Sequence, residues 1–104
     1  MAQWLVQQDG NSVAEFIARL SSERDFDEAT ALIKLLAAHG NRLGAPRSRA
    51  LGDGLFELRG KQVRIFYVFR SGKRIVLLDG MTKKRDAIPG DVLRRIRARA
   101  RQVP

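Results

Sequence analysis

The sequence predicts a single α+β domain over residues 1–104, with an N-terminal helical hairpin packed on a small twisted antiparallel sheet and a basic C-terminal helix. Three observations lead to this prediction: helical periodicity in the first half, period-two alternation over residues 55–84, and many arginines after Pro89. A chain of 104 residues suits one core. Because 44% of the residues are apolar, a packed fold is expected rather than disorder.

Two amphipathic helices are expected in the first half. In the first, Ser12 and Glu15 fit a capping box, and the apolar positions at helical spacing are Val13, Phe16, Ile17 and Leu20. In the second, Asp25 and Glu28 repeat the cap in D-x-x-E form, and the apolar face consists of Ala29, Leu32, Ile33 and Leu36. Gly40 is the residue expected to end this second helix.

Two segments beside these helices are less regular. Gln3 to Gln7 could form a short first strand, with Trp4 packed against the hairpin or the last helix. Residues 41–53 are rich in Gly, Pro and Arg and are expected to form a loop. Its length is at the upper end for a compact domain, which indicates function or mobility.

Three consecutive strands follow, at residues 55–59, 62–70 and 74–84. The first two are joined by a predicted turn at Gly60–Lys61, and the next two by one at Ser71–Gly72. Pro89 suits the first turn of the last helix. In that helix the residues that can face the core are Val92, Ile96, Ala100 and Val103. Arginines cover the rest of it, at positions 94, 95, 97, 99 and 101.

Positive charge is concentrated in the second half of the chain. Residues 1–46 hold four Lys or Arg and six Asp or Glu, a net charge of −2, whereas residues 47–104 hold sixteen and five, a net charge of +11. A charge of this size in one half favours a polyanionic partner, of which nucleic acid is the usual one. A basic surface that only keeps the protein in solution is the alternative.

Several site classes are not supported by the composition. The chain has no cysteine, so a disulfide, a thiolate metal site and a cysteine nucleophile are excluded. No metal-ligand spacing and no Gly-rich phosphate loop are found, so neither a metal nor a nucleotide cofactor is expected. His39, the only histidine, suits a helix end better than a catalytic base. Without a visible signal peptide or membrane span, a cytoplasmic protein is expected.

Strand alternation brings cations together. Glu57 and Arg59 share one face of their strand, and Arg64 lies mid-strand between apolar neighbours. Such an arginine needs a partner or a solvent-filled groove, and Glu57 across the hairpin is one candidate partner. Arg59, Arg64 and the Lys83–Lys84 pair can converge on one face or rim, since neighbouring strands lie about 4.8 Å apart. Cations packed in this way repel one another, and a phosphate among them makes the arrangement favourable.

Tyr67, in the central strand, has two interpretations. Its parity with Ile65 and Phe69 favours a place in the core. Alternatively, a bulge re-aims the side chain, which then stacks on a base or hydrogen-bonds to a phosphate.

The stretch of residues 50–97 resembles the phage-derived HigB-like branch of the RelE/ParE toxin superfamily. Members of that branch carry an L-x-E-[LI]-R strand, an R-x-x-Y strand, and a strand that ends in a Lys-Lys pair before a Pro-led basic helix. The matching residues here are Leu55, Glu57, Leu58, Arg59, Arg64, Tyr67, Lys83, Lys84 and Pro89. The N-terminal helices agree in kind but carry no diagnostic motif.

The resemblance implies a RelE-like fold and the toxin of a type II toxin–antitoxin system. Members of the superfamily are mostly ribosome-dependent mRNA endoribonucleases, and an antitoxin that usually carries a helix-turn-helix part neutralises them. The implied chemistry needs no metal and no small-molecule cofactor. The RNA 2′-OH attacks the adjacent phosphate and leaves a 2′,3′-cyclic phosphate.

The resemblance also implies roles for individual residues. The implied catalytic residues are Arg59, Arg64, Tyr67, Lys83 and Lys84. The two arginines would clamp the phosphate, and one of the lysines would stabilise the developing charge or act as general base. The implied RNA- and ribosome-binding residues are Arg47, Arg49, Arg70, Arg85, Arg94, Arg95 and Arg97.

The chain departs from the family pattern just before its lysine pair. Where many relatives read L-L-H-G-F, this chain has Leu77, Leu78, Asp79, Gly80 and Met81. The usual acid/base histidine is therefore absent, and Asp79 either acts as the base or pairs with a neighbouring arginine. Two other functions stay open: a non-catalytic or ParE-like inhibitor that poisons DNA gyrase, and a plain basic RNA-binding module.

Overall fold

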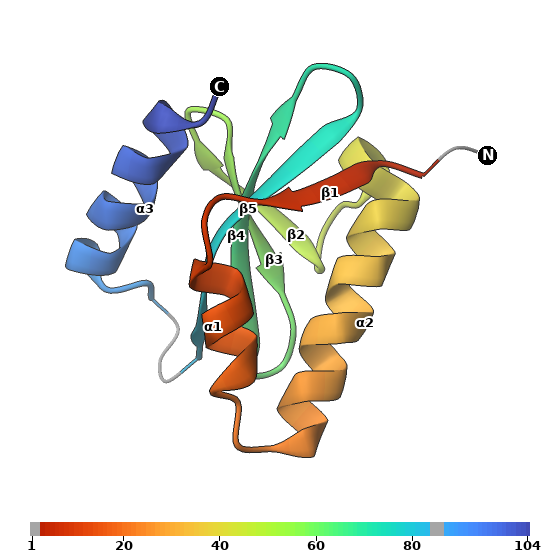
Figure 1. Ribbon diagram of the computed structural model, residues 1–104, viewed down its shortest axis with the longest axis vertical. Coiled ribbons are helices and arrows are strands. Elements are labelled where there is room, and N and C mark those ends of the chain that lie inside the picture. Colours follow the sequence, from red (N-terminus) through yellow and green to blue (C-terminus); the bar gives the residue numbers. More distant parts are fainter. Residues whose placement is uncertain (1–2, 84–86) are drawn as a thin grey trace.

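Five strands form one mixed sheet, and three α-helices cover it, in residues 3–83 and 87–104, which the computed structural model describes (Figure 1). In chain order the elements are β1 (Leu5–Gln8), α1 (Ser12–Ala18), α2 (Glu23–His39), a 3₁₀ turn (Gly40–Arg42), β2 (Ser48–Gly52), β3 (Leu55–Arg59), β4 (Val63–Arg70), β5 (Arg74–Thr82) and α3 (Gly90–Gln102). None of these helices is long and apolar enough to cross a membrane.

The sheet is not the purely antiparallel one that the sequence predicts. Its strand order is β1-β5-β4-β3-β2, and β1 runs parallel to β5 while the other neighbours are antiparallel. The first element is β1, near the short first strand considered for Gln3 to Gln7, and the two helices follow it instead of beginning the fold. The central strands β3, β4 and β5 confirm the three consecutive strands predicted from residue 55 onward, and the continuous buried runs of β4 and β5 show that both of their faces are covered.

Strand β2 lies where the sequence predicts a loop. Its segment is rich in Gly and Arg, yet it pairs with β3 from Ser48↔Leu58 to Gly52↔Leu55, with a bulge between Ala50 and Gly52. An edge strand gains backbone hydrogen bonds on one side only and exposes much of its surface, so it needs no apolar alternation. For this reason the residue types of β2 do not predict a strand.

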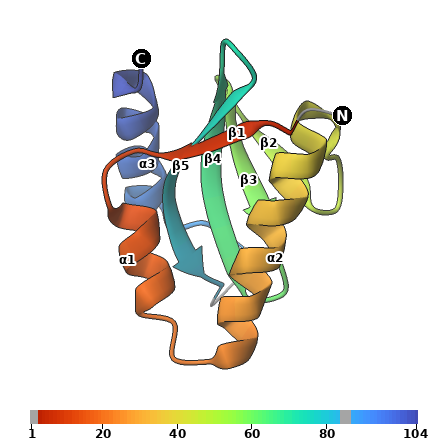
Figure 2. The same cartoon turned by 45° about the vertical axis from the view of Figure 1, so that its right-hand side comes forward.

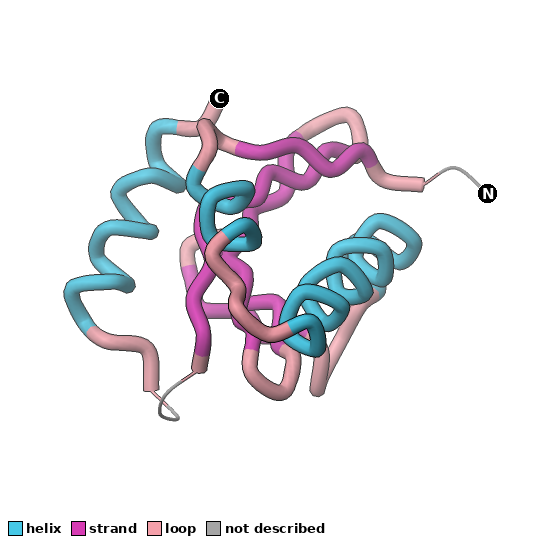
Figure 3. Tube along the Cα trace, turned by 60° about the horizontal axis from the view of Figure 1, so that its bottom comes forward, coloured by secondary structure: helices cyan, strands magenta, loops and turns pink. Residues whose placement is uncertain are grey.

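Helices cover both faces of the sheet (Figures 2 and 3). On one face, α1 and α2 enclose a core whose buried residues include Val13, Leu36 and Tyr67. On the other face, α3 packs through Ile96 against a second cluster that includes Phe66 and Leu78. The two clusters follow directly from alternate residues of β4 and β5 pointing to opposite sides.

The helix ends differ from the predicted capping boxes. Asn11 precedes α1 and makes no side-chain capping bond, and the Ser12 hydroxyl instead accepts a hydrogen bond from Arg99. Helix α2 is capped by Ser22, whose Oγ accepts from the Asp25 amide at 3.3 Å. Glu28 is therefore not needed as a cap. Gly40 does end α2, with φ +54°, and a β-carbon there would collide with the Trp4 ring.

Candidate phosphate-binding site

Four charged side chains from three neighbouring strands lie on one face of the sheet. They are Arg49 on β2, Glu57 and Arg59 on β3, and Arg64 on β4, and we call them the arginine cluster. Arg49 is directly opposite Glu57, and Arg59 is directly opposite Arg64. Directly paired residues point to the same face, and so do residues two apart on one strand. The pairing of β2, β3 and β4 therefore gathers all four.

Glu57 is the common partner of the three arginines. Its Oε1 lies 3.1 Å from Arg49 Nη2 and 3.5 Å from Arg59 Nε, and its Oε2 lies 3.6 Å from Arg64 Nε. The Glu57 side chain is only 3% exposed and Arg64 only 8%, whereas Arg59 and Arg49 are 36% and 46% exposed. The cluster therefore has a buried, ion-paired floor and two arginines that reach solvent. The sequence-based pairing of Glu57 with Arg64 is confirmed.

The hydrogen bonds of the cluster are incomplete. The ion pairs to Glu57 lack hydrogen-bond geometry, so among the residues that the structure describes Glu57 Oε1 and Arg59 Nε have no hydrogen-bond partner. Buried polar atoms without a partner are rare in folded proteins and call for an explanation. Three guanidinium groups around one carboxylate leave an excess of two positive charges. An anion that accepts from Arg59 Nε would give this donor a partner and would offset part of the excess positive charge.

Arg64 is held in place from within its own hairpin. Its Nη1 donates to the carbonyl of Gly60 and, at 3.1 Å, to that of Val63. Burial lowers the pKa of Arg64, and the charge of Glu57 raises it again. An arginine keeps its proton in proteins despite such shifts. Arg64 is therefore a fixed cation whose orientation depends on the β3–β4 turn.

The predicted lysine pair is placed only in part. The Lys83 amide donates to the Gln62 carbonyl at 2.6 Å, which puts the end of β5 beside the β3–β4 turn. Lys83 therefore lies next to the turn whose ends carry Arg59 and Arg64. Lys84 lies outside the described residues.

Tyr67 does not belong to the arginine cluster. Its side chain is fully buried on the opposite face, stacked on Phe56 with ring centroids 5.5 Å apart and bonded to Ser48 Oγ at 2.5 Å. Burial raises the pKa of the Tyr67 phenol, and the Ser48 hydrogen bond lowers it in part. The β4–β5 bulge between Phe66 and Tyr67 does not turn the ring outward. The core interpretation of Tyr67 is therefore confirmed, and the catalytic role predicted for it gains no support from this position.

The predicted RNA-binding arginines divide into two groups. Arg70 and Arg97 are half-buried and hold backbone: Arg70 donates to the carbonyls of Phe69, Ala100 and Val103, and Arg97 donates to those of Leu51 and Gly52. They fasten α3 to the sheet and to the β2–β3 turn. Exposed members of the set are Arg47, Arg94, Arg95 and Arg49, the last of which belongs to the arginine cluster. Arg85 lies outside the part of the chain that the structure describes.

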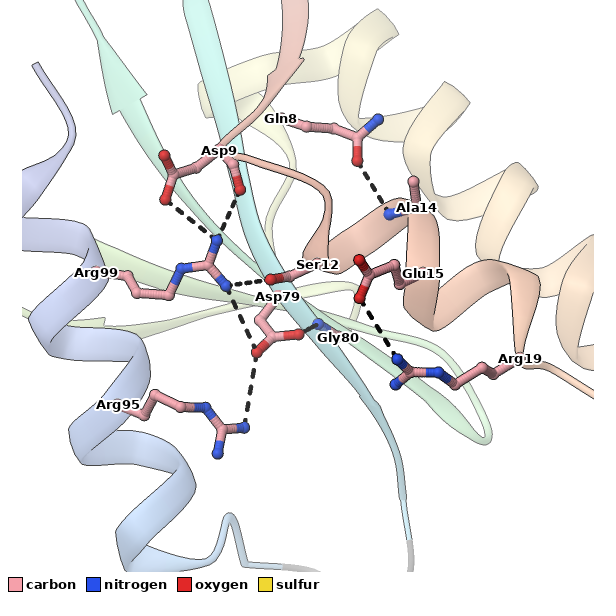
Figure 4. Close-up of polar contacts among 10 residues, drawn as sticks. All are labelled: Gln8, Asp9, Ser12, Ala14, Glu15, Arg19, Asp79, Gly80, Arg95 and Arg99. Carbon is pink, nitrogen blue, oxygen red and sulfur yellow. Dashed lines mark hydrogen bonds and ion pairs between the residues drawn. The ribbon is translucent and has the colours of Figure 1, made fainter.

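A second group of arginines fixes α3 to α1 and β5 (Figure 4). We call Asp9, Asp79, Arg95 and Arg99 the α3 network. Asp79 Oδ2 lies 3.7 Å from Arg95 Nη2 and 3.9 Å from Arg99 Nη1, and Arg99 Nη2 donates to the Asp9 carbonyl at 2.7 Å. Asp79 Oδ1 accepts from the Gly80 amide at 2.8 Å. Of the two roles considered for Asp79, the structure shows the ion pair.

Glu28, predicted from its D-x-x-E pattern to cap α2, has a different contact in the structure. It extends from α2 to the β3–β4 turn, where it accepts from the amides of Lys61, Gln62 and Val63 at 3.0, 2.9 and 2.7 Å. No sequence signal predicts this contact because it spans 33 to 35 residues.

The family model for phage-derived Gp49-like proteins matches residues 4–101. The chain belongs to this Gp49-like family. No curated protein sequence matches it. Among the residues described in this Gp49-like protein, no three His, Cys, Asp or Glu side chains are grouped so that they could hold a metal ion.

Solved structures similar to this Gp49-like protein include chains of two toxin–antitoxin complexes. One is the complex RelBE2 from Mycobacterium tuberculosis, with TM-score 0.61, 19% identity and coverage of 79% of this chain and 100% of that one. Another is the archaeal RelE–RelB complex from Pyrococcus horikoshii OT3, with TM-score 0.59, 15% identity and coverage of 80% and 98%.

A conserved hypothetical protein from Helicobacter pylori is also similar, with TM-score 0.51, 11% identity and coverage of 76% of this chain and 93% of that one. All these identities are low, so the likeness shows a shared RelE-like fold and nothing finer.

Proposed function

We propose that this Gp49-like protein is the toxin of a type II toxin–antitoxin system, of the HigB-like kind, and that it cleaves mRNA on the ribosome without a metal ion. The observation that carries this proposal is the arginine cluster, in which three guanidinium groups share the single buried carboxylate of Glu57. The RelE-like fold supports the same assignment, since similar chains occur in toxin–antitoxin complexes.

The cluster suits the charge changes of RNA transesterification. The 2′-oxygen forms a bond to phosphorus, the bond from phosphorus to the 5′-oxygen breaks, and a 2′,3′-cyclic phosphate is left. The 2′-OH proton passes to a base, and the departing 5′-oxygen takes up a proton. Negative charge grows on the non-bridging oxygens in the transition state, where fixed donors stabilise it most.

Each member of the cluster takes a part in this scheme. Arg59 and Arg64 clamp the phosphate, with Arg59 Nε as a donor that has no hydrogen-bond partner within the described residues. Arg49 adds a third cation at the solvent side. Glu57 keeps the three guanidinium groups together before substrate binds. Lys83 or Lys84 stabilises the developing charge or takes the 2′-OH proton.

Partners follow from the same proposal. The exposed arginines 47, 94 and 95 contact ribosomal RNA through its phosphates. An antitoxin, expected to carry a helix-turn-helix part, neutralises the protein, and the site of action is the cytoplasm, where translation takes place. Antitoxin chains are named in the structures of the RelE-like neighbours.

A translating extract supplied with one defined mRNA tests the activity. We expect cleavage that leaves 2′,3′-cyclic phosphate ends and needs ribosomes. Arg59→Ala should lower the cleavage rate about 100-fold or more, as loss of one transition-state donor does. Because Arg59 is 36% exposed, this variant should still fold.

Arg19→Ala is the matched control, since it removes the same charge from a side chain that is 77% exposed and directly follows α1. Its rate should equal that of the unchanged protein. An absence of cleavage, or equal rates for the two variants, would contradict the nuclease proposal. Inhibition of DNA supercoiling by gyrase instead would establish the ParE-like alternative.

A further inference from the structure

We propose that Glu28 is a positioning residue for the arginine cluster: it holds the β3–β4 turn in the conformation that aims Arg59 and Arg64 at one phosphate. The inference rests on the proposed function, because it concerns the same site. Glu28 itself lies on α2, which packs on the opposite face of the sheet, so it touches the turn and not the phosphate.

The Glu28 carboxylate occupies a cradle of backbone amides. Three consecutive N–H groups, from Lys61, Gln62 and Val63, donate to its two oxygens at 3.0, 2.9 and 2.7 Å. Hydrogen bonds to a charged acceptor are the stronger kind. Consecutive amides that converge on one anion fix the backbone dihedrals of the turn, because each N–H must point at the same place.

The β3–β4 turn also fixes the orientation of the Arg64 side chain. Its Nη1 donates to the carbonyls of Gly60 and Val63, which flank the amides that Glu28 holds. Arg59 and Arg64 are a directly opposed pair at the two ends of this turn. A change in the turn therefore moves the carbonyls that orient Arg64 and the strand ends that carry both guanidinium groups.

Gly60 supports this interpretation. A β-carbon at position 60 would collide with the carboxylate group of Glu28, so the Glu28 side chain can take its present position only beside a residue without a side chain. The contact is thus specific on both sides: an anion on α2 and a residue without a side chain in the turn. Lys61 and Gln62 need only their backbone for it.

The test compares Glu28→Gln with Asp27→Asn. Both remove one negative charge from α2, but the Asp27 side chain is exposed, so its variant is the control for net charge. An amide at position 28 can still accept at one oxygen, whereas its NH₂ group opposes a backbone donor. For Glu28→Gln we expect kcat of mRNA cleavage to fall about tenfold while KM changes less than twofold.

A side-chain signal separates positioning from mere support of the fold. The Nε–H resonance of Arg64, read by nitrogen-15 NMR on the free protein, should shift in Glu28→Gln and stay in place in Asp27→Asn. If Glu28→Gln does not fold, Gly60→Ala is the second variant, and it should shift the same resonance. An unchanged Arg64 resonance in a folded variant, or an unchanged kcat, overturns the inference.

The failure of this inference is distinguishable from failure of the proposed function. The NMR comparison requires no RNA and no ribosome, so it reports on the turn even if the unchanged protein cuts nothing. Where cleavage is seen, Glu28→Gln should cause a smaller further loss when Arg64 is already alanine than it causes in the unchanged protein, because part of its effect acts through Arg64. Equal losses in both backgrounds would show that Glu28 acts by another route.

Discussion

Two groups of arginines in this protein face carboxylates in different proportions. In the arginine cluster, Arg49, Arg59 and Arg64 all pair with Glu57, and within the described residues no second carboxylate lies at ion-pair distance from them, although Glu28 attracts Arg64 from farther away. Positive charge is therefore in local excess. In the α3 network, Arg95 and Arg99 face Asp9 and Asp79, so the charges balance. A balanced network needs nothing more and holds elements together, whereas an unbalanced one is stable only at a cost that a bound anion removes.

The largest effect is expected where the unbalanced cluster loses the carboxylate that its three arginines share. Glu57→Gln removes the paired counter-charge of three guanidinium groups, one of them only 8% exposed. We expect the free energy of unfolding to fall by about 3–5 kcal/mol, as for a broken buried pair. Urea denaturation measures this fall.

Adding inorganic phosphate to the denaturation experiment tests whether an anion can replace the Glu57 carboxylate. It should restore more stability to Glu57→Gln than to the unchanged protein, because it replaces the missing anion. As a control, Glu15→Gln breaks an exposed pair with Arg19 and should change the free energy of unfolding by less than about 1 kcal/mol. Equal losses in the two variants would mean that the cluster is no more than a surface ion pair.

A substitution in the α3 network is expected to cause a smaller loss of stability and no loss of mRNA cleavage. Arg99→Met removes the donors to Ser12 and Asp9 and the ion pair to Asp79. With Arg99 24% exposed, we expect the free energy of unfolding to fall by about 2–3 kcal/mol. The cleavage rate per folded molecule should stay within twofold, measured in the extract after correction for unfolded protein. A hundredfold slower rate would place the α3 network in the site.

The central strands show how far the sequence could predict this molecule. Alternation placed Arg59, Arg64 and Glu57 on one face because β3 and β4 are adjacent in the chain and joined by a short turn. Arg49 was assigned to RNA binding and not to the cluster, since its strand β2 was read as a loop. Local sequence patterns therefore predict the buried residues of the arginine cluster, Glu57 and Arg64, but not the solvent-exposed Arg49.

Contacts between segments that are far apart in the chain cannot be predicted from local sequence patterns. The parallel pairing of β1 with β5 joins residues about 70 positions apart, as in Leu5↔Arg74. Glu28 fits a capping pattern that the true cap, Ser22, makes unnecessary, and only the packing of α2 reveals its role. Periodicity shows which face a residue takes on its own element, whereas packing decides which other element that face meets.

The dependence of the free energy of unfolding on pH, below pH 7, should show the ionisation of Glu28. Burial raises the pKa of its carboxyl, but hydrogen bonds from the amides of residues 61–63 outweigh burial and leave the pKa below its ordinary value of 4.5. A lowered folded-state pKa stabilises the protein above pH 4.5, and this contribution is lost as pH falls through the folded-state value.

At pH 7 the free energy of unfolding of the unchanged protein should therefore exceed that of Glu28→Gln by about 1–2 kcal/mol. This difference should shrink when urea denaturation is repeated at pH 3.5. A difference that stays constant with pH would show that the carboxylate charge is not what the turn requires.

Arg95 is expected to have the smallest effect on stability, and it separates the two uses of arginine within the α3 network. It shares Asp79 with Arg99, but its side chain is 59% exposed. Arg95→Gln should change the free energy of unfolding by less than about 1 kcal/mol. If it contacts one RNA phosphate, the slope of log affinity against log salt should become shallower by about 0.7 for single-stranded RNA.

Affinity measured at several salt concentrations gives that slope. Arg99→Met is the comparison, because Arg99 is engaged with Asp9, Ser12 and Asp79 and should leave the slope unchanged. An unchanged slope for Arg95→Gln would assign Arg95 to holding α3 alone. A shallower slope would show that α3 binds RNA with the arginines that its own ion pairs leave in solvent.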